Sequence, residues 1–124
     1  MDNKKAWGWE LIINCSACDI EKITNGENIK GFILDLIKKI DMEAWGPPLL
    51  EHFATHDEEK AGYSVCQMIT TSAITGHFVD KNGDCYLNIF SCKPFVPVDA
   101  LDVVIKWFNP KKTSTEYITR LSPE

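Results

Sequence analysis

The sequence lacks the features that would place the protein in a membrane or on nucleic acid. Its longest apolar run is well short of the roughly 18 residues that cross a bilayer, and Met1–Trp7 has no apolar segment of a secretory signal. Thirteen basic residues against 18 acidic ones give a net charge of −5, with no basic stripe. We therefore expect a cytoplasmic protein that contacts neither a membrane nor nucleic acid.

Signatures of several common enzyme classes are also missing. The sequence has no Gly-x-Ser-x-Gly elbow, no Walker loop and no glycine-rich dinucleotide turn. Repeats, linkers and low-complexity stretches are absent, and the composition, 44% hydrophobic and 25% charged, is that of an ordinary globular protein. The 124 residues therefore predict a single domain, 1–124.

The cysteines indicate neither a disulfide framework nor a metal site. There are five, an odd number, at positions 15, 18, 66, 85 and 92, and a chain without an export signal rarely carries disulfides. Cys15 and Cys18 form a lone Cys-x-x-Cys motif. His52 and His56 have a spacing that zinc accepts, but more than 30 residues separate the two pairs. We expect no metal, and we expect the first four cysteines to be small buried side chains.

Hydrophobic periodicity divides the chain into strands and two main helices. Apolar residues from Ile29 to Ile40 recur at helical spacing, and a second helical stripe, Val98 to Phe108, follows Pro97, a residue suited to a first helical turn. Ser16–Asn25 is predicted as a turn or a short helical piece. Runs of β-branched and aromatic residues predict strands at 7–14, 49–55, 63–71, 74–79, 85–91 and 112–121.

This order of elements predicts a two-layer α/β sandwich, in which a mostly antiparallel sheet carries both helices on one face. Asn82-Gly83 predicts that strands 74–79 and 85–91 form a hairpin. A domain of this size has little core to spare, so a second copy of the chain would naturally cover the other face of the sheet. Four aromatic residues are expected in the core: Trp7, Trp9, Phe53 and Phe90.

Residues with hydroxyl, imidazole and thiol groups gather in the central strands. Ser72 ends the triplet Thr70-Thr71-Ser72, His77 follows five residues later, and Cys92 comes at the end of the next strand. Because the two strands are expected to pair, we expect Ser72, His77 and Cys92 to share one edge of the sheet. Taken singly, each residue is typical of structure rather than chemistry, and only their joint spacing indicates a function.

This spacing resembles that of the pyruvoyl-dependent S-adenosylmethionine decarboxylases of the short bacterial type. In that family the serine that becomes the pyruvoyl group has a second serine eight residues before it, a histidine five residues after it and a cysteine twenty residues after it. Ser64, His77 and Cys92 stand at these distances from Ser72. The family's opening strand and turn are also matched, by Gly8-Trp9-Glu10-Leu11 and Cys18-Asp19. The resemblance spans most of the chain and implies the family's sandwich fold and a homodimer.

The resemblance implies self-cleavage between Thr71 and Ser72, into fragments 1–71 and 72–124. Ser72 would attack the Thr71 carbonyl to form an ester, and elimination and hydrolysis would then leave a pyruvoyl group, derived from Ser72, as the covalent cofactor. By resemblance Ser64 and His77 assist this maturation, since a neutral imidazole suits proton transfer near pH 7.

The mature protein is then expected to decarboxylate a small substrate that the pyruvoyl carbonyl holds as a Schiff base, with that carbonyl as electron sink. Cys92 would by resemblance return a proton to the substrate carbon, and a thiol is largely protonated at neutral pH, as a donor must be. The implied substrate is S-adenosylmethionine, whose decarboxylated form supplies the aminopropyl group of spermidine in polyamine biosynthesis.

Departures from the family pattern leave the substrate open. Thr71 replaces a glutamate, Ala73 a histidine, and Lys81 the glutamate that accepts hydrogen bonds from the ribose hydroxyls, which lysine cannot do. Asp80 is then a candidate for those ribose contacts, and Phe53 a candidate for stacking on a flat ligand. Two alternatives remain: the same chemistry on arginine or ornithine, and an uncleaved homologue that binds or regulates a polyamine enzyme.

Overall fold

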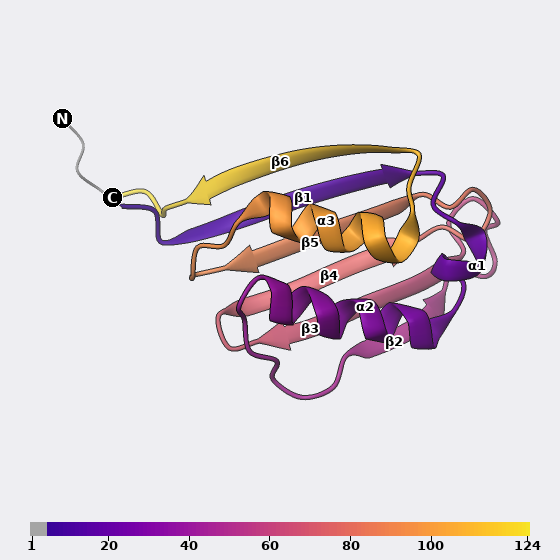
Figure 1. Cartoon of the computed structure of the whole chain (residues 1–124), viewed down its shortest axis with the longest axis horizontal. Helices are drawn as coiled ribbons and strands as arrows, with labels where there is room; N and C mark the ends of the chain where they lie inside the picture. Colours follow the sequence, from indigo (N-terminus) through magenta and orange to yellow (C-terminus); the bar gives the residue numbers. More distant parts are fainter. Residues whose placement is uncertain (1–4) are drawn as a thin grey trace.

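A computed structural model describes residues 5–124 as a six-stranded antiparallel sheet with helices on one face (Figure 1). The strands are β1 (Gly8–Ser16), β2 (Leu49–Phe53), β3 (Gly62–Ile69), β4 (Ser72–Phe78), β5 (Cys85–Ser91) and β6 (Lys112–Arg120). The helices are α1 (Ile20–Ile23), α2 (Gly26–Lys39) and α3 (Pro97–Phe108). The strand order is β2-β3-β4-β5-β1-β6, and every neighbouring pair is antiparallel. The predicted two-layer sandwich is confirmed.

The turn between β3 and β4 lies where the sequence prediction missed it. β3 ends at Ile69 and β4 begins at Ser72, whereas we expected strands ending at Thr71 and starting at Ile74. Ile69 and Ser72 are partners in the register, so the loop between them is only two residues long, Thr70 and Thr71. Threonine is β-branched and favours strands, so the composition gave no sign of a turn here. The predicted β4–β5 hairpin is confirmed.

Local capping sets the ends of the two long helices. α2 begins three residues before the first residue of its apolar stripe because the Asn25 side chain caps it, accepting a hydrogen bond from the Asn28 N–H at 3.2 Å. Beyond its C-terminus, Asp41 takes a left-handed conformation with φ 58°. α3 starts with Pro97 and ends before Asn109, which is also left-handed, with φ 48°.

The core lies between the sheet and the helices, which Figure 1 shows in front of the strands. Three fully buried rings join the layers: Phe108 of α3 lies 4.7 Å from Phe32 of α2 and 5.1 Å from Phe78 of β4, between ring centroids. Because side chains alternate along a strand, every second residue of the sheet points away from this core. In the described residues no helix is long and apolar enough to cross a membrane.

We call the side of the sheet opposite the helices the open face. In residues 5–124 no helix covers it, and several large apolar side chains of the strands are exposed there: Leu49, Phe53, Met68, Tyr86 and Ile118. An unpaired apolar sheet face is typical of a surface that meets another protein layer.

Some predictions of burial were wrong. Trp7 is 61% exposed and Phe53 is 54% exposed, since Trp7 precedes β1 and Phe53 ends the edge strand β2. Trp9 and Phe90 are half-buried. Cys66 was also expected in the core but is exposed, because it alternates with the inward-facing Val65 and Gln67.

Candidate functional site

Ser64 and His77 form a hydrogen-bonded pair. They lie opposite each other on β3 and β4, and the Ser64 Oγ is 2.7 Å from the His77 Nδ1. The other ring nitrogen, Nε2, is 2.6 Å from the Lys60 carbonyl oxygen, which can only accept. In the neutral ring Nε2 therefore carries the proton and Nδ1 accepts from the Ser64 hydroxyl. The pair thus presents an imidazole base of fixed orientation and a hydroxyl, as proton transfer requires.

The two-residue loop before Ser72 is held by the end of β5. The Cys92 N–H donates to the Thr71 carbonyl oxygen at 2.9 Å, and Ser72 lies opposite Ser91 in the register. A backbone N–H aimed at a carbonyl oxygen can stabilise the negative charge that develops there when a nucleophile attacks the carbonyl carbon. Thr71, Ser72 and Cys92 are therefore brought together.

The expectation that Ser72, His77 and Cys92 share one edge is wrong. Ser72 is the first residue of β4, paired with Ser91, whereas His77 is near its far end, paired with Tyr86. Five residues of extended chain span about 17 Å, at roughly 3.4 Å per residue. Within one chain the Ser64–His77 pair and the Ser72–Cys92 pair thus lie at opposite ends of β4.

The two predicted substrate contacts lie at the His77 end of the sheet. Asp80 follows β4, and its Oδ2 is 2.6 Å from the His52 Nε2, whereas its Oδ1 is buried with no hydrogen-bond partner among the described residues. Phe53 ends β2 opposite Gly62. Lys81, which stands in place of the family glutamate, is ion-paired with Glu59.

The Cys-x-x-Cys motif belongs to a buried thiol cluster. Cys15 lies opposite Cys85 on β5, and Cys15, Cys18 and Cys85 are all buried. The Cys18 contact lowers the pKa of Cys15, but the Cys85 contact and burial outweigh it and raise that pKa to about 12. His52, whose spacing from His56 zinc would accept, instead binds Asp80. Across residues 5–124 no group of three or more His, Cys, Asp or Glu side chains is placed to hold a metal ion.

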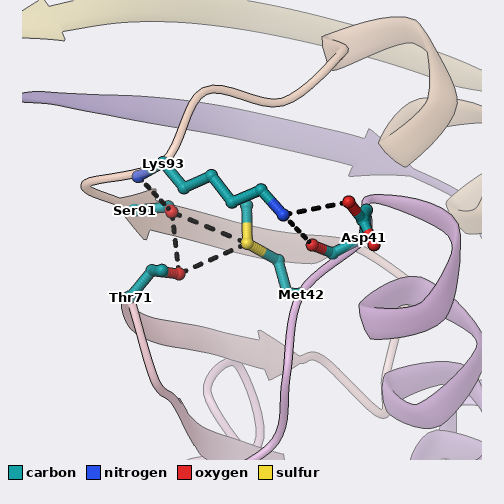
Figure 2. Close-up of polar contacts among 5 residues, drawn as sticks. All are labelled: Asp41, Met42, Thr71, Ser91 and Lys93. Atoms are coloured by element: carbon teal, nitrogen blue, oxygen red, sulfur yellow. Dashed lines mark hydrogen bonds and ion pairs between the residues drawn. The ribbon is translucent and has the colours of Figure 1, made fainter.

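Sequence reasoning missed a polar network on the helix side of the loop. Figure 2 shows the Thr71 hydroxyl beside Ser91 and Met42, with Lys93 reaching Asp41. A pocket of about 280 Å³ adjoins it, lined by Asp41, Met42, Glu43, Thr70, Thr71 and Lys93. One signal was available: Ser91 continues the inward-facing series of Leu87 and Ile89, so a buried hydroxyl could have been expected there.

A larger pocket, of about 530 Å³, lies at the same end of the sheet as Ser72. It is lined by Trp7, Phe90, Arg120, Leu121, Ser122 and Pro123. Its charged residue, Arg120, donates to the Glu10 carboxylate at 2.6 Å and lies 5.3 Å from the Phe90 ring centroid. The pocket thus has aromatic side chains in its walls, and the positive charge of Arg120 is balanced by the Glu10 carboxylate.

Comparisons with known proteins agree with this architecture. A sequence model of the family described as S-adenosylmethionine decarboxylase matches residues 9–121. No protein with a curated function matches the chain significantly. The structure is similar to the crystal structure of the adenosylmethionine decarboxylase from Aquifex aeolicus VF5, with a TM-score of 0.81, 20% identity, and coverage of 98% of this chain and 96% of that one. Because the family match covers most of the sequence, the chain belongs to the S-adenosylmethionine decarboxylase family.

Proposed function

We propose that the protein is a self-processing, pyruvoyl-dependent decarboxylase whose substrate is S-adenosylmethionine. The observation that carries this proposal is the hydrogen bond of 2.9 Å from the Cys92 N–H to the Thr71 carbonyl oxygen, next to Ser72. It supplies an oxyanion donor at the carbonyl that self-cleavage must attack. The family membership supports the same reaction.

Self-cleavage begins with an acyl shift. The Ser72 Oγ bonds to the Thr71 carbonyl carbon, the Thr71–Ser72 C–N bond breaks, and the hydroxyl proton ends on the Ser72 nitrogen. Loss of the Ser72 α-proton then expels the Thr71 carboxylate and leaves dehydroalanine. One water replaces its nitrogen, which departs as ammonia, and the new N-terminus is a pyruvoyl group. His77, with its basic Nδ1 toward Ser64, is suited to the proton transfers.

The surroundings of Ser72 fit a pyruvoyl group, which supplies an electron sink for the electron pair left when carbon dioxide departs. Cys92 is exposed at the end of β5, so its thiol can reach a substrate and return a proton to it. At the other end of β4, the partly exposed Asp80 carboxylate is the candidate acceptor for ribose hydroxyls; its Oδ2 contacts His52, and its Oδ1 has no hydrogen-bond partner among the described residues. Phe53 is exposed at the end of β2, next in sequence to His52, and is the candidate for stacking on a flat ring.

A homodimer joins the two halves of this site. Ser64 and His77 lie on the open face, and they are too far from Ser72 of the same chain to act on it. A second copy packed open face to open face in the opposite direction would place its Ser64–His77 pair near Ser72. The same packing would cover the exposed Met68 and Tyr86.

The deciding experiment is the denatured intact mass of freshly purified protein, with and without hydroxylamine or borohydride. We expect two fragments that break between Thr71 and Ser72, the second carrying a carbonyl that borohydride reduces. Ser72→Ala should remain full length and inactive, and decarboxylase activity in that variant would overturn the proposal.

The same preparation separates the alternatives. Cleaved protein is assayed for carbon dioxide release from S-adenosylmethionine, arginine and ornithine. Carbon dioxide release from arginine or ornithine but not from S-adenosylmethionine would change the proposed substrate and leave the proposed pyruvoyl chemistry unchanged. A wild-type chain that never cleaves would favour a binding or regulatory role.

A further inference from the structure

The side chain of Thr71 belongs to a chain of hydrogen bonds. The Lys93 N–H donates to the Ser91 Oγ at 2.9 Å, and the Ser91 hydroxyl donates to the Thr71 Oγ1 at 2.9 Å. The Thr71 hydroxyl in turn donates to the Met42 sulfur at 3.3 Å (Figure 2). In this arrangement each hydroxyl accepts one hydrogen bond and donates another.

Ser91 is the centre of this chain and has no access to solvent. It is 0% exposed, and its Oγ also lies 3.7 Å from the Met42 sulfur. A buried hydroxyl is costly unless it is hydrogen-bonded, so Ser91 is held to these partners rather than to water. Because Ser91 lies opposite Ser72 in the register, the chain acts at the proposed cleavage point.

The loop that carries Thr71 needs such support from outside. Two-residue hairpin loops are usually stabilised by Gly, Asn or Asp, and here the loop is Thr70-Thr71. The segment after α2 lies along it: the Thr70 N–H donates to the Glu43 carbonyl at 2.9 Å, and Ala44 bridges to Ile69. Lys93 ties both supports together, donating from Nζ to the Asp41 carbonyl at 2.6 Å and its carboxylate at 2.9 Å.

Thr71 is therefore clamped at two points. Its carbonyl oxygen accepts from the Cys92 N–H, and its side chain is held by Ser91 and Met42. We propose that Ser91 and the Thr71 hydroxyl are positioning residues for self-cleavage: their hydrogen bond fixes the Thr71 carbonyl against the Cys92 N–H for attack by Ser72. This inference rests on the proposed function, and it assigns the two hydroxyls to the acyl shift, before the ester forms.

The test follows self-cleavage over time by intact mass in protein made by cell-free synthesis. The variants are Ser91→Ala, Thr71→Val, which keeps the shape of threonine, and Thr71→Ser, which keeps its hydroxyl. Ile89→Val is the matched control, because Ile89 is a buried neighbour on β5 with no polar contact. Losing the bond should slow cleavage about tenfold to a hundredfold, as expected when a reacting group is misplaced by a fraction of an ångström to one ångström.

We expect Thr71→Ser to cleave near the wild-type rate, and Ile89→Val to do so even though it melts earlier. The double variant that combines Ser91→Ala and Thr71→Val should cleave no more slowly than the slower of the two single variants, because both substitutions remove the same hydrogen bond between Ser91 and Thr71. The uncleaved protein of each slow variant should resist hydroxylamine, since no ester has formed.

Three results would overturn the positioning role while leaving the proposed function intact. They are wild-type cleavage rates in Ser91→Ala or Thr71→Val, multiplicative slowing in the double variant, and hydroxylamine-sensitive full-length protein. If Ser91→Ala does not fold, the comparison of cleavage rates between Thr71→Val and Thr71→Ser decides whether the hydroxyl of Thr71 positions the cleavage site. A wild-type chain that stays whole would instead refute self-cleavage itself, and the positioning role with it.

Discussion

Ser72 and His77 stand at opposite ends of one strand, β4, with their register partners Ser91 and Tyr86 on β5. The two residues that the family spacing links are thus kept apart by the extended backbone between them. A site that uses both needs a second chain.

This separation predicts complementation between two inactive variants. When Ser72→Ala and His77→Ala chains with different tags are co-expressed, a mixed dimer contains one site with Ser72 from one chain and His77 from the other. The His77→Ala chain should then be cleaved, although neither variant is cleaved alone. Intact mass of the tagged chains is the measurement, and a His77→Ala chain that stays whole in verified mixed dimers would contradict the shared site.

Cys92 is expected to serve the two stages of the reaction through different groups. Its backbone N–H contacts the Thr71 carbonyl, and its exposed thiol is free to donate a proton. Cys92→Ala retains the N–H, so self-cleavage should proceed within about tenfold of the wild-type rate, whereas decarboxylation should fall by about a hundredfold or more. Cleavage is measured by mass and decarboxylation by release of carbon dioxide. Equal losses in both would show that the thiol itself is needed for maturation.

Gly62 is predicted to be essential for the start of β3. A Cβ on Gly62 would lie 1.6 Å from the Phe78 carbonyl oxygen, so any side chain forces β3 away from the end of β4. Gly62→Ala should lower the free energy of unfolding by about 1–3 kcal/mol or more. In contrast, a Cβ on Gly26 meets only movable side-chain atoms, of Leu50 and Tyr63, so Gly26→Ala is the matched control. Urea denaturation measures both, and equal stability of the two variants would contradict the prediction.

Asp35 makes stability depend on pH. Its carboxylate accepts from the Trp107 Nε1 at 2.7 Å and from the Lys106 Nζ at 3.1 Å, and these contacts hold the pKa of Asp35 below its ordinary value of 3.8. Because the folded-state pKa is the lower one, the contribution to stability is present above the ordinary value and is lost as the pH falls through the folded-state pKa.

Asp35→Asn should therefore melt earlier than wild type at pH 7, and the gap should narrow as the pH falls below 3.8, the ordinary pKa of the Asp35 carboxyl. Thermal unfolding across this range, with both proteins at matched ionic strength, is the measurement. A gap that stays constant with pH would assign the effect to packing against Trp107 rather than to charge.

Much of the architecture could be predicted from the sequence because it depends on local periodicity. The stripe from Ile29 to Ile40 and the stripe after Pro97 are long and regular, and both became helices on one face of the sheet. The Asn82-Gly83 turn correctly joined β4 to β5. Each of these signals lies within one element or one hairpin.

The candidate site was harder to predict because it depends on distance in space. The strand that carries His77 was predicted to begin at residue 74, so the sequence did not show that Ser72 lies on the same strand and that its extended backbone separates the two residues. The contacts of Thr71 with Met42 and Ser91 bring together segments that are 29 and 20 residues away in the chain. The turn at Thr70-Thr71 was missed because β-branched residues conceal it.

The strand order has a consequence for a chain cut after Thr71. The first fragment would contribute β1, β2 and β3, and the second β4, β5 and β6, yet β1 lies between β5 and β6. The two fragments would be interlocked: β3 is paired with β4 on one side, and β1 is held on both edges by strands of the other fragment. Neither could leave without dismantling the sheet, so the severed polypeptide would persist as one particle, and its halves would part only on denaturation.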